Sequence, residues 1–245
     1  TNDCNFNCAY CHISAGEEGS EDSGMDKETA DKIIDFIFSV NNERNEIILE
    51  GGEPLIEFEL IEHIYKRASK LSEEQDKELK MSFTSNMSLM DEDKAEKIEK
   101  MGIKTICASL DGPEEVHNVQ RQDYEKVVEW GEELKEDFGI HVHYMPVLTR
   151  KTFENSTPKE FVDEYVDKGQ DIIFFKLFRP TGRGKNIELR YSAERYFEFW
   201  KEGIEYIIDL NKKGKKIKER VATNLLTNIL TNERTSMCFR RPCGA

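Results

Sequence analysis

Residues 47–54 read IILEGGEP, a short apolar run that ends in a glycine pair and a proline. A run of this kind, bounded by turn residues, is typical of a buried strand. The next segment, 55–71, has the one-sided apolar spacing of an amphipathic helix, at Leu60, Ile61, Ile64 and Ala68. Strand, turn and helix follow one another without a gap, and this βα unit is the pattern that decides the fold.

The alternation of strand and helix repeats on both sides of this unit. Further strands are predicted at 79–84, 103–110, 140–148 and 172–177. Further helices are predicted at 26–41, 91–101, 122–138, 158–168, 192–213 and 218–231. Because strands that alternate with helices form a parallel sheet with right-handed crossovers, the sequence predicts an α/β fold. We expect a partial TIM-like (β/α)6 barrel of parallel strands whose first strand would precede Thr1, and we interpret the chain as a fragment or a processed form.

Two of these helices begin with a local signal. Thr157 and Glu160 have the spacing of a capping box around Pro158, which suits the first helical position. The helix at 91–101 opens on Asp91, whose negative charge suits a helix N-terminus. Both starts are therefore predicted independently of the apolar pattern.

The composition excludes several classes of protein. The chain has 245 residues, 38% of them hydrophobic and 34% charged, which suits one globular domain with a sizeable core. The formal net charge of −14 argues against nucleic-acid binding, because a phosphate backbone attracts basic surfaces. No apolar run approaches the roughly 18–20 residues of a membrane span, and no signal peptide is visible. We expect a cytoplasmic protein that binds neither nucleic acid nor membrane.

Three of the six cysteines lie close together near the start of the chain. Cys4, Cys8 and Cys11 have the spacing C-x3-C-x2-C. So short a loop can wrap three thiolates around one [4Fe–4S] cluster, and three ligands leave one iron open to a substrate or cofactor. A zinc site with His12 as fourth ligand and a cluster used only for electron transfer are the alternatives. Cys107, alone in a predicted strand, is interpreted as a small buried apolar residue.

With Tyr10 as the aromatic residue before Cys11, the cysteine loop resembles the signature of the radical S-adenosylmethionine superfamily. The resemblance continues with GGEP at 51–54 and ASLDGP at 108–113, each at the end of a predicted strand. It is similar to the peptide-modifying branch, which includes anaerobic sulfatase-maturating enzymes and thioether-forming peptide maturases. Such proteins have a partial β/α barrel, whose chemistry lies at the carboxyl ends of the strands.

The resemblance implies which residues surround the cofactors. Cys4, Cys8 and Cys11 would hold the [4Fe–4S] cluster. The residues that would contact S-adenosylmethionine are Tyr10, Glu50, Gly51, Gly52, Glu53, Pro54, Ser85, Ser109, Asp111, Arg121 and Leu177.

Within that set the resemblance assigns separate parts of the cofactor. The glycine turn would let the backbone approach the ligand, and Glu53 would hold the methionine amino group. Ser109 would contact the cofactor through its hydroxyl, and Arg121 would pair with the methionine carboxylate. The region from Leu177 would meet the adenine. The alternatives are a surface ion pair of Arg121 with an acid at 123 or 125, a helix cap at Asp111, and an ordinary loop for the Gly-Arg-Gly turn at 182–184.

Two further cysteines lie near the end of the chain. Cys238 and Cys243 resemble the beginning of a C-terminal extension, called SPASM or twitch, that carries auxiliary [4Fe–4S] clusters. Two thiolates cannot complete such a cluster. We expect residues 1–190 to form the barrel core, 191–236 to be helices that lead to the extension, and 237–245 to begin it.

The resemblance also implies a reaction. Reductive cleavage of S-adenosylmethionine would give methionine and a 5′-deoxyadenosyl radical, which abstracts hydrogen from a peptide or protein side chain. The electron would come from an external low-potential donor of the ferredoxin or flavodoxin type. A small-molecule substrate and a glycyl-radical activase are the alternatives among enzymes. A non-catalytic iron–sulfur or zinc module is the alternative outside them.

Overall fold

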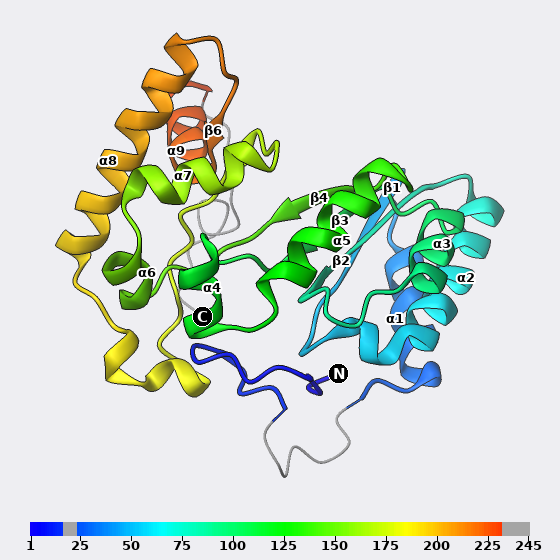
Figure 1. The fold of residues 1–245 in the computed structure, drawn as a ribbon. Coiled ribbons are helices and arrows are strands. Elements are labelled where there is room, and N and C mark those ends of the chain that lie inside the picture. The colour runs from blue at the N-terminus through cyan, green and yellow to red at the C-terminus, as the bar shows by residue number, and fades with distance from the viewer. Residues whose placement is uncertain (17–23, 232–245) are drawn as a thin grey trace.

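A computed structural model describes residues 1–16 and 24–231 (Figure 1). Its first half contains α1 (Lys27–Ser39), β1 (Arg44–Leu49), α2 (Phe58–Gln75), β2 (Glu78–Ser85), α3 (Glu92–Lys100) and β3 (Thr105–Ala108). Its second half contains α4 (Glu114–Gln120), α5 (Tyr124–Glu136), β4 (His141–Tyr144), α6 (Arg150–Asn155), α7 (Pro158–Asp167), β5 (Ile172–Ile173), α8 (Ala193–Lys212), β6 (Lys218–Glu219) and α9 (Arg220–Thr231). Short 3₁₀ helices are η1 (Pro54–Glu57), η2 (Gly182–Lys185) and η3 (Ile187–Leu189). The predicted Cys238 and Cys243 lie outside the described residues.

The paired strands are parallel, as predicted. β1, β2, β3 and β4 form one sheet in that order, and β5 pairs with β6. An isolated parallel bridge between Leu148 and Leu177 connects the two sheets. The α/β fold with parallel strands is therefore confirmed, and the described strands form an open arrangement in place of one closed barrel.

The sequence prediction was wrong at the start of the last helix. Lys218 and Glu219 form β6, so that α9 begins at Arg220 and not at 218. Two charged residues carry no apolar strand signal. The buried Glu219 carboxylate accepts the N–H groups of Val221 (3.0 Å) and Ala222 (2.6 Å), which caps α9 from within the strand. α4 and α6 were not predicted, because helices of one or two turns show too few apolar repeats.

Both predicted helix starts are confirmed. The Thr157 hydroxyl accepts the Glu160 N–H (3.2 Å), and the Glu160 carboxylate accepts the Thr157 N–H (2.8 Å). The Asp91 carboxylate accepts the Lys94 N–H at the start of α3 (2.9 Å). The core lies between the sheet and its helices, with fully buried side chains such as Phe38, Phe83, Ile106, Leu134 and Phe161.

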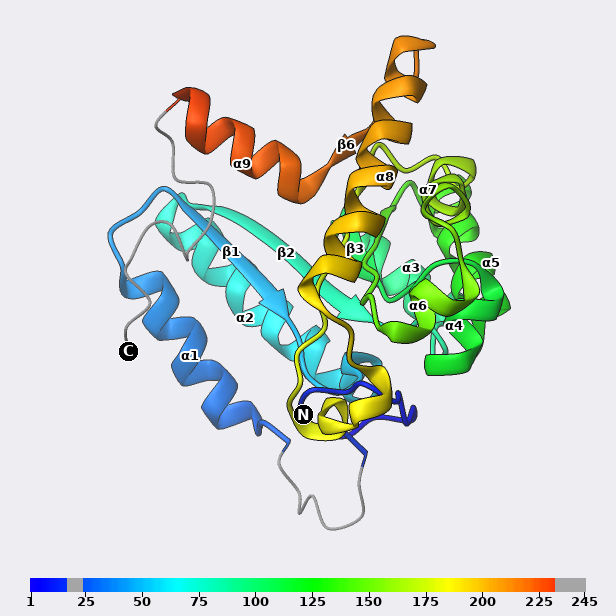
Figure 2. The ribbon, with the colours of Figure 1, turned by 90° about the vertical axis from the view of Figure 1, so that its left-hand side faces the viewer.

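The N-terminal segment lies against the carboxyl ends of the strands (Figure 2). Backbone hydrogen bonds join Gly52 N–H to the Thr1 carbonyl (2.9 Å) and Glu53 N–H to the Asp3 carbonyl (2.8 Å). The ladder also continues beyond the strands as assigned, since Met145 N–H donates to the Ala108 carbonyl at 2.8 Å. The fold thus brings the cysteine loop to the strand ends. Among the described helices, none combines the length and the apolar character that a membrane span requires.

Candidate functional site

A cavity of about 290 Å³ lies between the cysteine loop and the carboxyl ends of the strands. The predicted site residues that line it are Cys4, Cys8, Tyr10, Cys11, Glu50, Gly51, Gly52, Ser85, Ser109, Arg121 and Leu177. Residues that the prediction missed also line it, among them Met145, Val147 and Lys176. The structure therefore brings together segments that are more than a hundred residues apart in the sequence.

Three predicted residues lie behind this wall. Glu53, Pro54 and Asp111 are buried and do not line the cavity. They lie next to residues that line the cavity and support them from behind. Glu53 and Pro54 belong to the glycine turn, and Asp111 belongs to a buried network with Tyr10 and Arg121.

The cysteine loop holds two of its sulfur atoms near backbone N–H groups. Phe6 N–H lies 3.4 Å from the Cys4 Sγ atom, and Ala15 N–H lies 3.4 Å from the Cys11 Sγ atom. Burial raises the pKa of the Cys4 and Cys8 thiols, and the positive charge of a bound metal would oppose that rise and favour the thiolates. Donor groups at sulfur and a thiolate-only set of ligands fit an iron–sulfur cluster.

A single metal ion and a cluster would make different demands on the loop. Residues 1–16 and 24–231 contain no group of three or more His, Cys, Asp or Glu side chains that could hold one metal ion. Zinc would require the three sulfurs and a fourth ligand around one atom, whereas a [4Fe–4S] cluster takes each cysteine on a different iron.

The Gly-Arg-Gly turn at 182–184 is hydrogen-bonded to the cysteine loop. The Arg183 guanidinium donates to the carbonyls of Cys8 (Nε, 2.9 Å) and Ala15 (Nη1, 2.9 Å). The Arg183 N–H donates to the Cys11 carbonyl at 2.9 Å, and a Cβ atom on Gly182 would lie 2.5 Å from that same oxygen. This turn is therefore a clamp on the loop, and the alternative of an ordinary loop was wrong.

The glycine turn has a structural reason for its glycines that the sequence did not indicate. A Cβ atom on Gly51 would lie 2.5 Å from the Thr1 carbonyl, and one on Gly52 would lie 2.0 Å from the Asp3 carbonyl. The close approach is thus made by the N-terminal segment of the chain. Glycines here allow the segment before the cysteine loop to pair with the turn.

Glu53 joins the turn to the end of β2. Its buried carboxylate accepts hydrogen bonds from Leu55 N–H (3.0 Å), the Ser85 hydroxyl (2.8 Å) and Asn86 N–H (2.7 Å). Burial raises the pKa of this carboxyl, and the three donors oppose that rise. The carboxylate is occupied by the protein itself, so Glu53 orients the residues around it.

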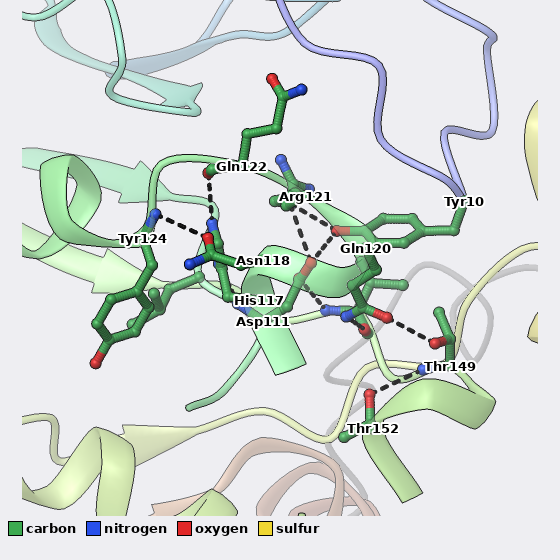
Figure 3. Close-up of polar contacts among 12 residues, drawn as sticks. Tyr10, Asp111, His117, Asn118, Gln120, Arg121, Gln122, Tyr124, Thr149 and Thr152 are labelled. Carbon is green, nitrogen blue, oxygen red and sulfur yellow. Dashed lines mark hydrogen bonds and ion pairs between the residues drawn. The ribbon is translucent and has the colours of Figure 1, made fainter. Parts of the chain in front are cut away.

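Arg121, Asp111 and Tyr10 form a buried network beside the cysteine loop (Figure 3). The Arg121 Nε atom donates to the Tyr10 hydroxyl oxygen (2.7 Å) and lies 3.1 Å from the Asp111 Oδ2 atom. The Tyr10 hydroxyl donates to the same Oδ2 atom at 2.6 Å. Arg121 therefore pairs with Asp111, and the alternative of a surface ion pair with an acid at 123 or 125 was wrong.

Asp111 has a second partner in this network. Its Oδ1 atom accepts the Val147 N–H at 2.9 Å, and its side chain is fully buried. The residue before α4, in the cap position, is Pro113, so the helix-cap alternative for Asp111 was wrong. Asp111 ties the end of β3 to the end of β4 and holds Arg121 at the cavity wall.

His117 supports the backbone next to Asp111. Its Nδ1 atom accepts the Asp111 N–H at 3.2 Å, and its Nε2 atom lies 2.8 Å from the Gln122 carbonyl oxygen, to which it donates in this tautomer. Burial lowers the pKa of His117, which favours the neutral ring. This histidine had no assigned role in the sequence prediction.

Comparisons with proteins of known sequence agree with this geometry. Residues 1–157 match the family model of the radical SAM superfamily. An uncharacterized protein of Methanocaldococcus jannaschii is 29% identical over 199 residues, which cover 80% of this chain and 66% of that protein. The radical SAM cyclopropyl synthase TigE of Paramaledivibacter caminithermalis is 26% identical over 186 residues (67% and 38%). A probable GTP 3′,8-cyclase of Saccharolobus islandicus is 28% identical over 221 residues (87% and 66%).

Two solved structures share the fold. Native anSMEcpe with bound AdoMet superposes with a TM-score of 0.84 at 21% identity, over 96% of this chain and 66% of that one. Streptococcus suis SuiB bound to its precursor peptide SuiA superposes with a TM-score of 0.68 at 15% identity, over 89% and 46%. The chain spans 66% of the length of anSMEcpe and less of SuiB. At these identities the likeness concerns the fold.

The match of the family model extends over more than half of the chain and includes the three-cysteine loop, the glycine turn and Arg121. A [4Fe–4S] cluster and S-adenosylmethionine are the cofactors that this family implies. This chain belongs to the radical SAM superfamily.

Proposed function

We propose that this chain is the catalytic core of an enzyme that uses S-adenosylmethionine to abstract hydrogen from a peptide or protein side chain. One observation carries the proposal. The three cysteines and Arg121 face the same cavity and are connected through Tyr10, whose hydroxyl contacts Arg121 (2.7 Å) and Asp111 (2.6 Å). A cluster module without a cofactor would not need a buried arginine held in this way.

The residues take distinct parts in this proposal. Cys4, Cys8 and Cys11 hold the cluster, which, when bound, supplies the electron that cleaves S-adenosylmethionine to methionine and a 5′-deoxyadenosyl radical. Arg121 binds the methionine carboxylate, because a planar guanidinium pairs well with a carboxylate. Among the described lining residues the acidic one is Glu50, which suits the methionine amino group.

The remaining predicted residues orient this constellation. Asp111 and Tyr10 fix Arg121, and Glu53 with Pro54 fixes the turn after β1. Ser85, Ser109 and Leu177 line the rest of the cavity, where the ribose and the adenine would lie. Burial in the cavity keeps water from a reactive radical.

The peptide substrate is supported by the nature of the proteins that share the fold. The anSMEcpe structure has also been determined with AdoMet and a bound peptide, and SuiB with its precursor peptide. A small-molecule substrate is the second candidate, and the GTP 3′,8-cyclase relatives favour it. A glycyl-radical activase is the remaining enzyme alternative.

Further parts of the proposal concern the surroundings of the core. We propose that Cys238 and Cys243 belong to an auxiliary [4Fe–4S] cluster, whose other ligands would come from an extension. The electron donor would be a ferredoxin or flavodoxin type protein. A cluster of this kind is sensitive to oxygen, so we place the protein in a reducing, low-oxygen cytoplasm, without nucleic-acid or membrane partners.

The test is anaerobic reconstitution with iron and sulfide, followed by dithionite and S-adenosylmethionine and by mass spectrometry of 5′-deoxyadenosine. We expect production by the wild type, none by Cys8→Ala, and a retained cluster in His12→Ala. Loss of the metal from the His12→Ala variant would support the zinc alternative. A loaded cluster that yields no 5′-deoxyadenosine would overturn the catalytic proposal.

A further inference from the structure

A second cavity, of about 360 Å³, adjoins the first. Its wall includes Cys107, His143, Phe174 and Arg220, and it shares Met145 with the cofactor cavity. Cys107 is half-buried and lines this cavity, so its interpretation as a small buried apolar residue was wrong. The second cavity has no part in the proposed binding of the cluster or of S-adenosylmethionine.

Strand geometry explains why the two cavities share a wall. Cys107 on β3 is in register with His143 on β4, and Met145, which continues the ladder just beyond the end of β4, follows His143 on the same side. Phe174 and Lys176 share one side of the extended segment after β5 in the same way. Phe174 lines the second cavity and Lys176 the first, so both walls pass from one cavity to the other.

The second cavity is basic, in contrast to the whole protein. The chain contains 49 acidic and 35 basic residues, yet none of the described residues that line this cavity is acidic. Lys218 and Arg220 bring positive charge to its wall. The Arg220 guanidinium carbon lies 4.8 Å from the centre of the Phe174 ring, which holds the charge beside the cavity.

Lys176 adds a cation where the two cavities meet. Its Nζ atom lies 3.3 Å from the Met145 Sδ atom, and no ion pair joins it to an acidic residue in the described parts of the chain. Arg121, in the same cavity, differs in that Asp111 neutralises it. Burial lowers the pKa of Lys176, the nearby Arg121 and Arg179 charges add to the decrease, and the Asp111 and Glu50 carboxylates oppose it without forming an ion pair with the lysine.

A largely buried ammonium group with no carboxylate in ion-pair contact is unfavourable unless a ligand supplies that contact. We propose that Lys176 and Arg220 form an anion subsite, which receives a carboxylate or phosphate group of the substrate beside the cofactor cavity. This inference rests on the proposed function, because it assigns a property to the substrate of that site. A carboxylate would come from an acidic residue of a peptide, and a phosphate from a nucleotide.

Binding of matched pairs of probes tests the subsite without turnover. Isothermal titration calorimetry would use the cluster-loaded protein with saturating S-adenosylmethionine. One pair is acetyl-Gly-Glu-Gly-amide and its Gln analogue, and the other is GTP and guanosine. We expect the anionic member of one pair to bind at least about tenfold more tightly than its neutral partner. The pair that shows the difference identifies the source of the anion.

Two variants assign that difference to the subsite. Lys176→Met keeps the length of the side chain, and Arg220→Gln keeps a polar group. Each should reduce the preference for the anion by about tenfold, while Lys32→Met, on the exposed face of α1, should preserve it. Because Lys176 has no acidic partner, Lys176→Met should also unfold at a temperature no lower than the wild type does.

The possible failures are distinct. Equal binding of both members in both pairs, or the absence of binding by all four probes, would overturn the subsite. So would an unchanged preference in Lys176→Met and Arg220→Gln. Failure of the proposed function shows itself differently, as a loaded wild-type cluster that makes no 5′-deoxyadenosine, whatever the probes bind.

Discussion

The Nε atom of Arg121 lies 3.1 Å from the Oδ2 atom of Asp111, in an ion pair whose side chains are 13% and 0% exposed. The Tyr10 hydroxyl lies between them, with 2.7 Å to Arg121 and 2.6 Å to Asp111. Tyr10 precedes Cys11, so this pair couples the cysteine loop to the end of β3. Both of these contacts are made by the Nε atom of Arg121, and the Arg121 residue also lines the cavity.

Asp111→Asn should uncouple Arg121 from its position. The substitution leaves a buried guanidinium without a counter-charge, which destabilises a protein by about 3 kcal/mol. The affinity for S-adenosylmethionine should fall by about tenfold or more, because the guanidinium is no longer held at the cavity wall. Urea unfolding and equilibrium dialysis measure the two effects.

Asp123→Asn is the matched control for that variant. Asp123 is the nearby acid first considered as a partner of Arg121, and its φ of 58° is one that asparagine tolerates. We expect both the free energy of unfolding and the affinity to stay near the wild-type values. An equal effect of the two substitutions would contradict the assigned role of Asp111.

Gly52→Ala should displace the N-terminal segment. The new Cβ atom would lie 2.0 Å from the Asp3 carbonyl oxygen, a contact that only movement of the backbone can relieve. Forced overpacking of this kind costs about 1–3 kcal/mol, and here it acts next to Cys4. We expect a clear loss of bound iron and sulfide after reconstitution.

The control for Gly52→Ala is Gly24→Ala. A Cβ atom on Gly24 would meet its nearest neighbour, a Glu57 carboxylate oxygen, at 3.8 Å, which is ordinary contact. Its iron and sulfide content should equal that of the wild type. A full cluster in Gly52→Ala would show that the N-terminal segment does not need its pairing with the turn.

The parallel fold and about half of the cavity wall could be predicted from the sequence because both depend on local patterns. Apolar runs followed by glycine or polar residues mark strand ends, and parallel strand ends meet at one edge of a sheet. The role of Asp111 could not be predicted in this way. Its partners Tyr10 and Val147 lie 101 and 36 residues away, so only the fold brings them together.

Other contacts also could not be predicted, for a physical reason. The sequence did not indicate that the N-terminal segment of the chain itself approaches the glycines at 51 and 52. Lys176 was missed because a lysine in a strand carries no motif, and its significance comes from the lack of an acidic partner among the described residues. Sequence patterns indicate where polar groups lie, but not which of them are already neutralised.

His117 predicts a dependence of stability on pH. Burial lowers its pKa in the folded state, where Asp111 and Asp123 oppose the decrease and Arg121 adds to it. The unfolded chain therefore binds the proton more readily, and the stability due to the neutral ring is lost as the pH falls below 6.5, the ordinary value. Above that pH this contribution is complete.

Urea unfolding between pH 8 and pH 5 can isolate the His117 contribution. The exposed His12 and the half-buried His143, whose pKa values are also lowered, add to the slope of the wild type. His117→Gln should therefore show a smaller loss of stability on acidification, and not a complete absence of it. An identical slope in the variant and the wild type would exclude His117 as a contributor.

Arg183→Gln should weaken the hold on the cysteine loop. The guanidinium donates from two different nitrogens to the carbonyls of Cys8 and Ala15, both at 2.9 Å, and glutamine is shorter and has a single nitrogen, which cannot take both positions. A hydrogen bond from a charged donor is worth about 1.5 kcal/mol, so loss of one should speed the release of iron to a chelator about tenfold. Arg190→Gln is the control, because the Arg190 side chain donates at 3.1 Å to the Lys185 carbonyl, outside the cysteine loop. If the two variants released iron at the same rate, the Gly-Arg-Gly turn would not be the clamp that its contacts indicate, and the loop would owe its shape to the network around Tyr10 instead.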